Sequence, residues 1–212
     1  MKKGSKNLSK KALFITFEGI DGCGKSTQLD LAAKYLETKG IDLIKTRDPG
    51  GTPLGCKIRE ILLNYDGNVA SYCELFLYLA DRAQHVEEKI LPALKLKKLV
   101  LCDRYVDSTM AYQGYARGLG AEQILNLNNI VAKSLMPDLT FVFDVSLETS
   151  RQRVGDKKDR LESEADEFHK KVREGYLDLA EKFPERIVII DANKDISEVE
   201  KNVIEVLNKR VL

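Results

Sequence analysis

No apolar run in this sequence of 212 residues is long enough to span a membrane. The lysine-rich residues 1–11 are followed by a short apolar segment that Glu18 interrupts, which argues against a secretory signal. The four cysteines form no C-x-x-C pair, which argues against a zinc site or a disulfide framework. These absences predict a protein of the reducing cytoplasm, with residues 1–11 as a flexible leader.

The sequence also lacks an excess of charge of either sign, an internal repeat and a low-complexity block. Its 34 basic and 33 acidic residues leave a net charge of +1, so no global field attracts the chain to a nucleic-acid polymer or a membrane. We therefore expect neither as a partner. A small anionic ligand needs only a local basic site, and the length suits one domain, which we place at residues 12–212.

Short runs of apolar and β-forming residues predict five buried strands. These runs cover residues 12–18, 41–46, 99–103, 138–145 and 185–192. Helical spacing of apolar residues predicts helices between them. The helices cover residues 25–38, 53–63, 71–91, 123–135 and 195–209, and a further short helix starts within 146–154. We expect Pro92 to end or kink the third helix and Pro137 to follow the end of the fourth.

This alternation of strands and helices is typical of an α/β fold with a parallel sheet and helices on both faces. Between the first strand and the first helix, Gly19 is followed by four residues and then by Gly24-Lys25-Ser26. Backbone N–H groups of such a loop, together with the helix N-terminus, can hold the phosphates of ATP. A glycine turn that binds nothing is the alternative, but the strand–helix context favours a site. The expected ATP-binding residues are Gly19, Ile20, Asp21, Gly22, Cys23, Gly24, Lys25, Ser26 and Thr27.

Asp103 ends the third predicted strand, where ligands bind in folds of this class. Ser26 and Asp103 are the expected Mg²⁺ residues, and Asp103 could also orient the attacking oxygen. A capping or salt-bridged aspartate is the alternative for Asp103. Cys23 lies beside Lys25 at a helix N-terminus, so it is either a reactive thiol shielded by ATP or a small buried side chain.

Three further stretches are more specific than the loop. "TRDPGGTPLGCKIREILL", "LFLYLADRAQHVEEKILPAL" and "DRYVDSTMAYQGYARG" resemble signatures of the thymidylate kinase family in its bacterial form. The resemblance runs from residue 12 to the last helix. It implies a P-loop NTPase-like three-layer fold with a five-stranded parallel sheet and a short lid at about residues 150–162. It also implies ATP-dependent phosphorylation of dTMP to dTDP, Mg²⁺ as cofactor and a homodimer.

The resemblance further implies a set of residues for dTMP. Arg59 and Arg104 would bind its phosphate, Asp21 its 3′-hydroxyl, and Tyr112 would lie against the deoxyribose. The thymine base would contact Tyr78, Arg82, Thr109 and Gln113. Asp48 stands where the family usually has glutamate, and no role is assigned to it.

The phosphate loop contains no arginine. In members of the family that lack this arginine, basic residues of the lid supply the cation that stabilises the transferred phosphate. The residues "SRQRVGDKKDRLESE" place five cations within ten positions: Arg151, Arg153, Lys157, Lys158 and Arg160. Arg153 is the first candidate for this catalytic cation and Arg151 the second. Lys25 and Arg104 are also expected to take part in catalysis. A solvated charged helix is the alternative for this segment. Ala192 and Asn193 are candidates for backbone contacts to adenine.

Other functions stay open on the sequence alone. A kinase for another nucleotide or for a nucleoside would share the phosphate loop. A nucleotide-dependent switch would need a γ-phosphate-sensing segment, and for GTP an N-K-x-D motif, whose spacing the "NKD" at Asn193 lacks. A nucleic-acid binder would need a larger basic patch than one short lid.

Overall fold

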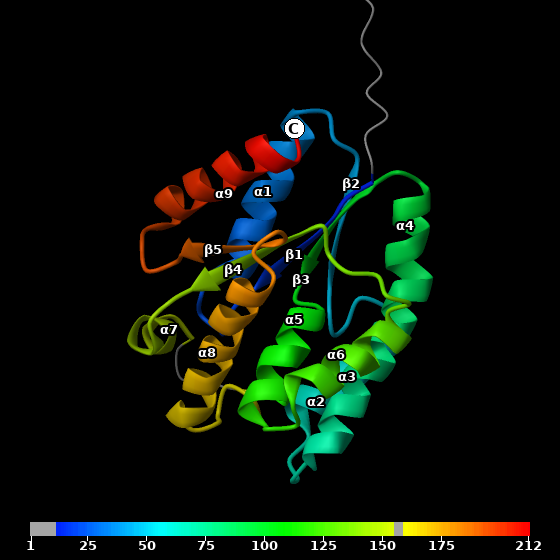
Figure 1. Cartoon of the computed structure of the whole chain (residues 1–212), viewed down its shortest axis with the longest axis vertical. Coiled ribbons are helices and arrows are strands. Elements are labelled where there is room, and N and C mark those ends of the chain that lie inside the picture. Colours follow the sequence, from blue (N-terminus) through cyan, green and yellow to red (C-terminus); the bar gives the residue numbers. More distant parts are fainter. Residues whose placement is uncertain (1–11, 155–158) are drawn as a thin grey trace, which may run out of the picture.

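A computed structural model describes residues 12–154 and 159–212, so the predicted leader and part of the predicted lid lie outside the described residues. Five parallel strands form one sheet in the order β2-β3-β1-β4-β5 (Figure 1). The strands are β1 (Phe14–Glu18), β2 (Leu43–Arg47), β3 (Leu99–Asp103), β4 (Leu139–Asp144) and β5 (Ile187–Asp191). The predicted α/β class with its five-stranded parallel sheet is confirmed.

Helices cover both faces of this sheet, which gives the three predicted layers (Figure 1). On one face, α1 (Lys25–Thr38) packs on β1, β2 and β3, and α9 (Ile196–Arg210) packs on α1 and β5. On the other face, α4 (Leu91–Lys95) packs on β3, and α8 (Asp166–Lys182) packs on β4 and β5. Within the described parts of the chain, no helix combines the length and apolarity that a membrane span requires.

Six further helical segments form the end of the molecule at which the strands β1 and β3 terminate. They are α2 (Pro53–Asn64), α3 (Ser71–His85), α5 (Val106–Thr109), the π-helix η2 (Met110–Ala116), α6 (Ala121–Val131) and α7 (Leu147–Val154). Parallel sheets bind ligands at the carboxyl ends of their strands, next to the point where the strand order reverses. These helices therefore surround the place where a ligand is expected.

Burial explains why the central elements form. All five residues of β1 are buried, as a strand covered on both faces requires. The helix α1 buries Leu29, Ala32, Ala33 and Leu36 along one stripe, at the spacing of its apolar residues. The predicted bounds of this helix and of β3 are both confirmed.

Three expectations about helices need correction. Of the two outcomes expected for Pro92, an end or a kink, the end does not occur, because a π-helical segment η1 (Val86–Ile90) precedes it and the helical run continues as α4; the kink stays a prediction. The helix α6 stops at Val131, before the predicted residue 135, because Lys133 and Ser134 adopt positive φ angles of 53° and 55°.

The third correction concerns α8, which was not among the predicted helices. It spans 17 residues and buries Phe168, Val172, Tyr176 and Leu179. These residues recur every three or four positions, which is the signal of an amphipathic helix. The many charged residues between them hid this apolar stripe.

Glu18, the last residue of β1, is completely buried. Its Oε2 atom accepts hydrogen bonds from Ser108 (2.5 Å) and Tyr176 (3.2 Å), whereas Oε1 has no partner among the described residues. Burial, together with the nearby charge of Asp107, raises the pKa of Glu18 to about 7 from its ordinary value of 4.5. Glu18 therefore takes up a proton on folding in weakly acidic solution.

This proton uptake predicts a pH-dependent effect of Glu18→Gln. Because the pKa of this carboxyl is raised in the folded state, its contribution to the free energy of unfolding decreases as the pH rises from 4.5 to about 7. Glutamine mimics the protonated form and does not titrate. The stability of Glu18→Gln relative to the wild type should therefore increase between pH 5 and pH 8, by at most on the order of 3 kcal/mol.

Urea unfolding at both pH values measures this difference. Glu205→Gln is the matched control, since Glu205 is exposed on α9 and the same chemical change there should show no such pH dependence. A relative stability of Glu18→Gln that is equal at pH 5 and pH 8 would contradict the burial of an ionising group at this position.

Candidate active site

The loop between β1 and α1 has the conformation that its glycines allow. Gly22 and Gly24 have φ angles of 73° and 85°, in the left-handed region that favours glycine. A side chain on Gly22 would also meet the backbone oxygen of Ser150 in α7 at 2.5 Å. Gly24 precedes α1 without a side-chain cap, and the space beside it is open. The first N–H groups of α1 are therefore available to an anion.

Asp21 connects this loop to the end of β3. Its Oδ1 atom lies 2.7 Å from Arg104 Nη2 and 3.2 Å from Lys25 Nζ, and its Oδ2 atom accepts a hydrogen bond from Tyr112 (3.3 Å). Burial alone would raise the pKa of the Asp21 carboxyl, but the charges of Arg104 and Lys25 hold it well below its usual range. Asp21 is thus an anion that pairs with both Arg104 and Lys25 through the same carboxylate oxygen.

Asp103 and Ser26 meet beside the loop, as the parallel register of β1 and β3 requires. The Ser26 hydroxyl donates to Asp103 Oδ2 over 2.6 Å. A hydroxyl and a carboxylate oxygen are ligands of the kind that Mg²⁺ prefers. The two residues predicted for a metal are therefore neighbours, and they line a groove with the cations Lys45, Arg47 and Lys89.

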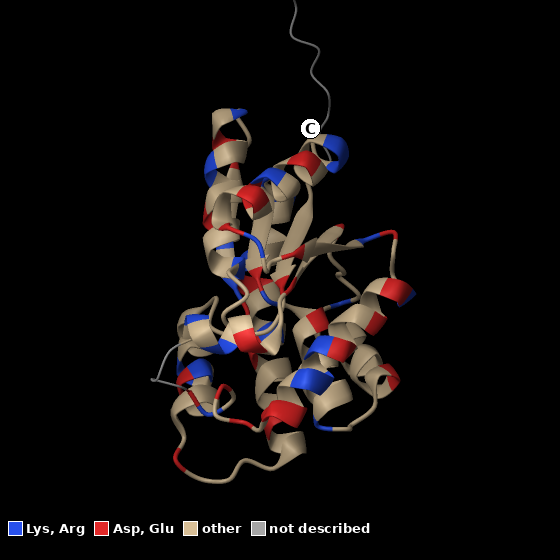
Figure 2. Cartoon of the chain, turned by 90° about the vertical axis from the view of Figure 1, so that its left-hand side faces the viewer, with Lys and Arg blue, Asp and Glu red and all other residues tan. Residues whose placement is uncertain are grey.

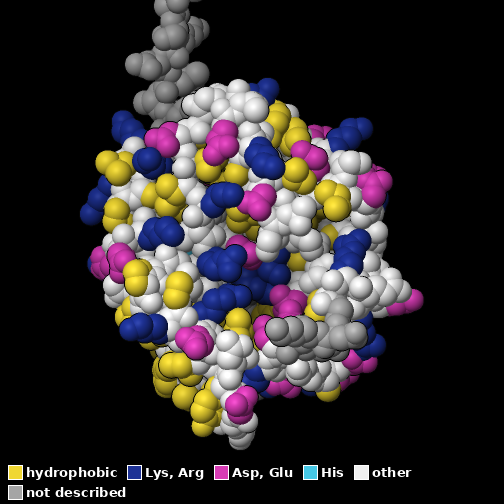
Figure 3. Space-filling view, turned by 180° about the vertical axis from the view of Figure 1, so that it is seen from behind, with side chains coloured by type: hydrophobic (Ala, Val, Ile, Leu, Met, Phe, Trp, Pro, Cys, Tyr) yellow, Lys and Arg dark blue, Asp and Glu magenta, His cyan; other side chains and the backbone are white. Residues whose placement is uncertain are grey.

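Basic side chains gather around a hollow on one face of the molecule (Figure 3). Elsewhere, acidic and basic residues alternate along the elements (Figure 2). This distribution fits a local anion site better than a continuous surface for a polyanion.

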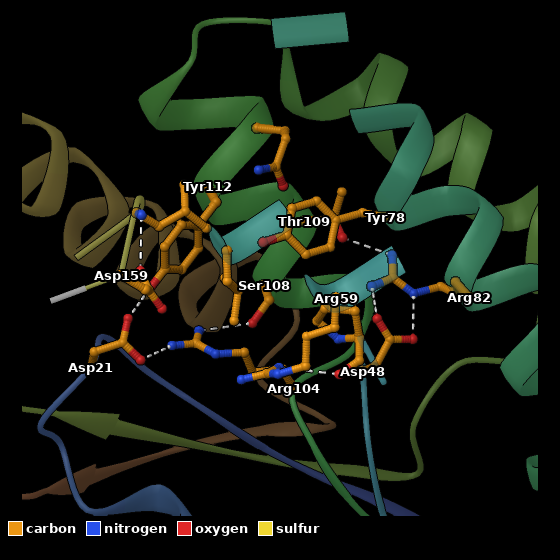
Figure 4. A pocket seen from close by; sticks show the side chains of 14 residues that line it. Asp21, Asp48, Arg59, Tyr78, Arg82, Arg104, Ser108, Thr109, Tyr112 and Asp159 are labelled. Atoms are coloured by element: carbon orange, nitrogen blue, oxygen red, sulfur yellow. Dashed lines mark hydrogen bonds and ion pairs between the residues drawn. The ribbon is translucent and has the colours of Figure 1, made fainter. Parts of the chain in front are cut away.

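A cleft of about 490 Å³ opens between the loop, α3 and η2 (Figure 4). The cleft brings together every residue predicted for the acceptor: Asp21, Arg59, Tyr78, Arg82, Arg104, Thr109, Tyr112 and Gln113. Sequence reasoning missed other residues that line it: Asp48, Pro49, Leu63, Ser108, Asp159 and Leu161.

The two sides of the cleft differ in chemistry. Arg59 and Arg104 lie near Asp21 on one side, and Tyr78 and Thr109 lie above them (Figure 4). Arg104 has a φ angle of 66°, which is uncommon for a residue other than glycine. Such strain concentrates at functional sites. The cationic side suits a phosphate, and the aromatic side suits a flat ring.

Arg82 is tied to the protein more tightly than the sequence suggested. It forms a buried ion pair with Asp48 through Nε (3.2 Å) and Nη2 (2.8 Å). Its other hydrogen bonds go to Thr109 (2.7 Å), Asn128 (2.5 Å) and the Tyr105 carbonyl (3.1 Å). These five bonds equal the five N–H donors of a guanidinium. A direct contact between Arg82 and a base stays a prediction that requires one of them to exchange.

A second pocket lies behind the phosphate loop. Gly22, Cys23, Gly24 and Thr27 line it together with Ala192. Ala192 is one of the two residues predicted for adenine contacts; the other, Asn193, is not among the described residues that line this pocket, and the contacts themselves stay a prediction. Ile20, by contrast, is packed into the hydrophobic core.

The hypothesis of a reactive Cys23 does not hold. Cys23 is 2% exposed, and burial raises the pKa of its thiol although Lys25 acts in the opposite direction. The alternative, a small buried side chain, is confirmed.

Arg153 and Arg151 lie on α7, the helix that contacts the phosphate loop. Arg153 lines the second pocket and donates to the Ala192 carbonyl over 2.9 Å. Arg151 forms an exposed ion pair with Asp166. In this conformation, both guanidinium groups have protein partners.

Arg160, a third predicted lid cation, is bound to α2 and α3. It donates to the Leu62 carbonyl (2.9 Å) and to Glu74 (2.6 Å). Lys157 and Lys158 lie outside the described residues. Arg160 is therefore an anchor of its segment in this structure.

Comparisons with known proteins agree with this geometry. A family model described as thymidylate kinase matches residues 17–203. A thymidylate kinase of Caldanaerobacter subterraneus subsp. tengcongensis is 50% identical over 197 residues, covering 92% of this chain and 95% of that protein. One from Sulfurihydrogenibium sp. is 48% identical over 198 residues, covering 93% and 97%.

A solved structure extends the similarity to three dimensions. The crystal structure of thymidylate kinase from Ehrlichia chaffeensis aligns with a TM-score of 0.78 at 40% identity. The alignment covers 93% of this chain and 98% of that one. The chain belongs to the thymidylate kinase family.

Proposed function

We propose that this chain transfers the γ-phosphate of ATP to dTMP and forms dTDP. An oxygen of the dTMP phosphate attacks the γ-phosphorus, the bond to the β,γ-bridging oxygen breaks, and ADP leaves with that electron pair. The main support is the cleft in which all the predicted acceptor residues meet beside the phosphate loop. A kinase for another nucleotide or for a nucleoside is the alternative that the experiment below addresses.

Phosphoryl transfer requires two polyanions to be held in line. Arg104 and Lys25 are close enough to share Asp21, and Arg59 lines the same cleft. We assign Arg59 and Arg104 to the acceptor phosphate and Lys25 to the phosphates of ATP. Asp21 holds Arg104 and Lys25 near each other before either substrate arrives.

The Ser26 hydroxyl and the Asp103 carboxylate are the proposed residues for Mg²⁺, because their oxygens lie 2.6 Å apart beside the first turn of α1. When bound, Mg²⁺ would neutralise charge on the phosphate oxygens. Asp103 could otherwise orient the acceptor oxygen.

Asp21 and Tyr112 are the proposed contacts for the deoxyribose. Asp21 can accept a hydrogen bond from the 3′-hydroxyl. Tyr112 is held near Asp21 by its own hydroxyl and lies under Arg104, whose guanidinium carbon is 5.0 Å from the ring centre. A ring held in this way would leave little room for a 2′-hydroxyl.

We also propose that the protein is a homodimer of the cytoplasm. Its described cysteines are free, as a reducing compartment requires. Helices α2 and α3 expose large apolar side chains that a second copy could cover: Leu54, Ile61, Tyr72 and Phe76. A nucleic-acid polymer is not proposed as a partner.

A panel of acceptors tests the reaction. Initial rates with Mg-ATP should give the highest kcat/KM for dTMP. The value for dUMP should be about 10-fold lower, since one methyl group is missing. Ribose TMP should be rejected at Tyr112, and thymidine should be poor because it lacks the phosphate that Arg59 and Arg104 bind. A preference for dUMP or thymidine over dTMP would contradict the proposal.

Substitution of Arg153 tests whether this residue is the catalytic cation that the phosphate loop itself does not supply. Arg153→Ala should lower kcat by roughly 100-fold while KM for dTMP and for ATP change little, because the contact would form only in the transition state. Arg151→Ala, on the same helix, should have the smaller effect. Near-normal turnover by Arg153→Ala would remove this assignment.

A further inference from the structure

Glu74 of α3 is a completely buried carboxylate behind the aromatic side of the cleft. Its Oε2 atom accepts hydrogen bonds from Arg160 (2.6 Å) and Arg117 (3.1 Å), and its Oε1 atom accepts one from Arg117 (3.2 Å). Oε1 also accepts a hydrogen bond from Gln113 Nε2 over 2.8 Å. Glu74, which does not line the cleft, thus binds Gln113, which does.

This arrangement determines which way the Gln113 amide points. Burial alone would raise the pKa of Glu74, but its hydrogen bonds to Arg117, Gln113 and Arg160 lower it below the ordinary value. An ionised carboxylate only accepts hydrogen bonds. The NH₂ group of Gln113 must therefore face Glu74, because the opposite orientation would bring two acceptor oxygens together.

The side-chain carbonyl oxygen of Gln113 consequently points the other way. This side-chain oxygen, Oε1, accepts no hydrogen bond from residues 12–154 or 159–212. Gln113 is otherwise buried, and the cleft is the cavity that it lines. The cleft therefore presents a hydrogen-bond acceptor that has no partner among the described residues.

We propose that Glu74 is a specificity-determining positioning residue, which fixes the Gln113 amide so that the acceptor pocket prefers a base with an N–H group at position 3. This inference rests on the proposed function. Thymine and uracil carry N3–H, which can donate to the Gln113 carbonyl. Cytosine has an unprotonated N3, and two acceptors would then face each other. A site built for a hydrogen bond rejects a base that cannot form it.

Thr109 supports the same preference. Its hydroxyl oxygen accepts a hydrogen bond from Arg82 over 2.7 Å, which leaves its hydrogen free to donate. Thr109 and Gln113 therefore offer a donor and an acceptor four residues apart. The O4 and N3–H groups of thymine are complementary to this pair.

The substitution Glu74→Gln tests the proposal. The amide that this variant carries on α3 can donate as well as accept, so Gln113 can reverse its own amide and offer NH₂ to the cleft. The probe is 5-methyl-dCMP, which keeps the methyl group and differs from dTMP only at N3 and C4. The ratio of kcat/KM for dTMP to that for 5-methyl-dCMP should fall by about 10-fold or more.

The readout is insensitive to a general loss of folded protein, since both substrates are measured on one preparation and the active fraction cancels. The ratio of dTMP to dUMP should stay constant in Glu74→Gln, because both bases carry N3–H. The matched control is Glu164→Gln, which removes the Arg117 ion pair to Glu164 but leaves Gln113 bound to Glu74. Its discrimination should equal that of the wild type.

A second variant covers the case in which Glu74→Gln is inactive. Gln113→Leu removes the acceptor and should lower kcat/KM for dTMP, with little change for 5-methyl-dCMP. An unchanged ratio in Gln113→Leu, or an unchanged ratio in an active Glu74→Gln, overturns the inference. Failure of the wild type to phosphorylate dTMP would instead overturn the proposed function, so the two failures are distinguishable.

Discussion

The ion pair between Asp21 and Arg104 is the interaction on which the site depends. It joins the phosphate loop after β1 to the residue that follows β3, over 2.7 Å. Lys25 shares the same carboxylate oxygen, so one anion balances two cations in a partly buried position. Without that anion, two positive charges would repel each other in a region of low dielectric. The pair thus prepares a cationic centre between the donor loop and the acceptor cleft.

Buried acids elsewhere use the same principle to fix polar side chains around the cleft. Asp48 holds Arg82, and Glu74 holds Gln113 together with Arg160. Glu18 differs, since it accepts hydrogen bonds from two hydroxyls and has no cation directly paired with it among the described residues. In each case the acid contacts a group near the substrate pocket.

Much of this architecture could be predicted from the sequence, because it depends on local patterns. Apolar spacing predicted α1 and the sheet, and motif spacing predicted the residues that meet in the cleft. The partners of charged side chains could not be predicted, because they lie far apart in the chain. Arg160, predicted as a lid cation, forms an ion pair with Glu74, and Arg82 forms one with Asp48. The environment of Cys23 depended on burial, which loop spacing does not determine.

The most direct test of the central ion pair is the kinetics of Asp21→Asn, which keeps the size of the side chain and removes its charge. The kcat/KM for dTMP should fall by roughly 30-fold or more, as expected when one member of a partly buried, hydrogen-bonded charge pair is lost. The urea unfolding transition should show that the variant remains folded. A folded Asp21→Asn enzyme whose kcat/KM for dTMP lies within about twofold of the wild type would contradict the account.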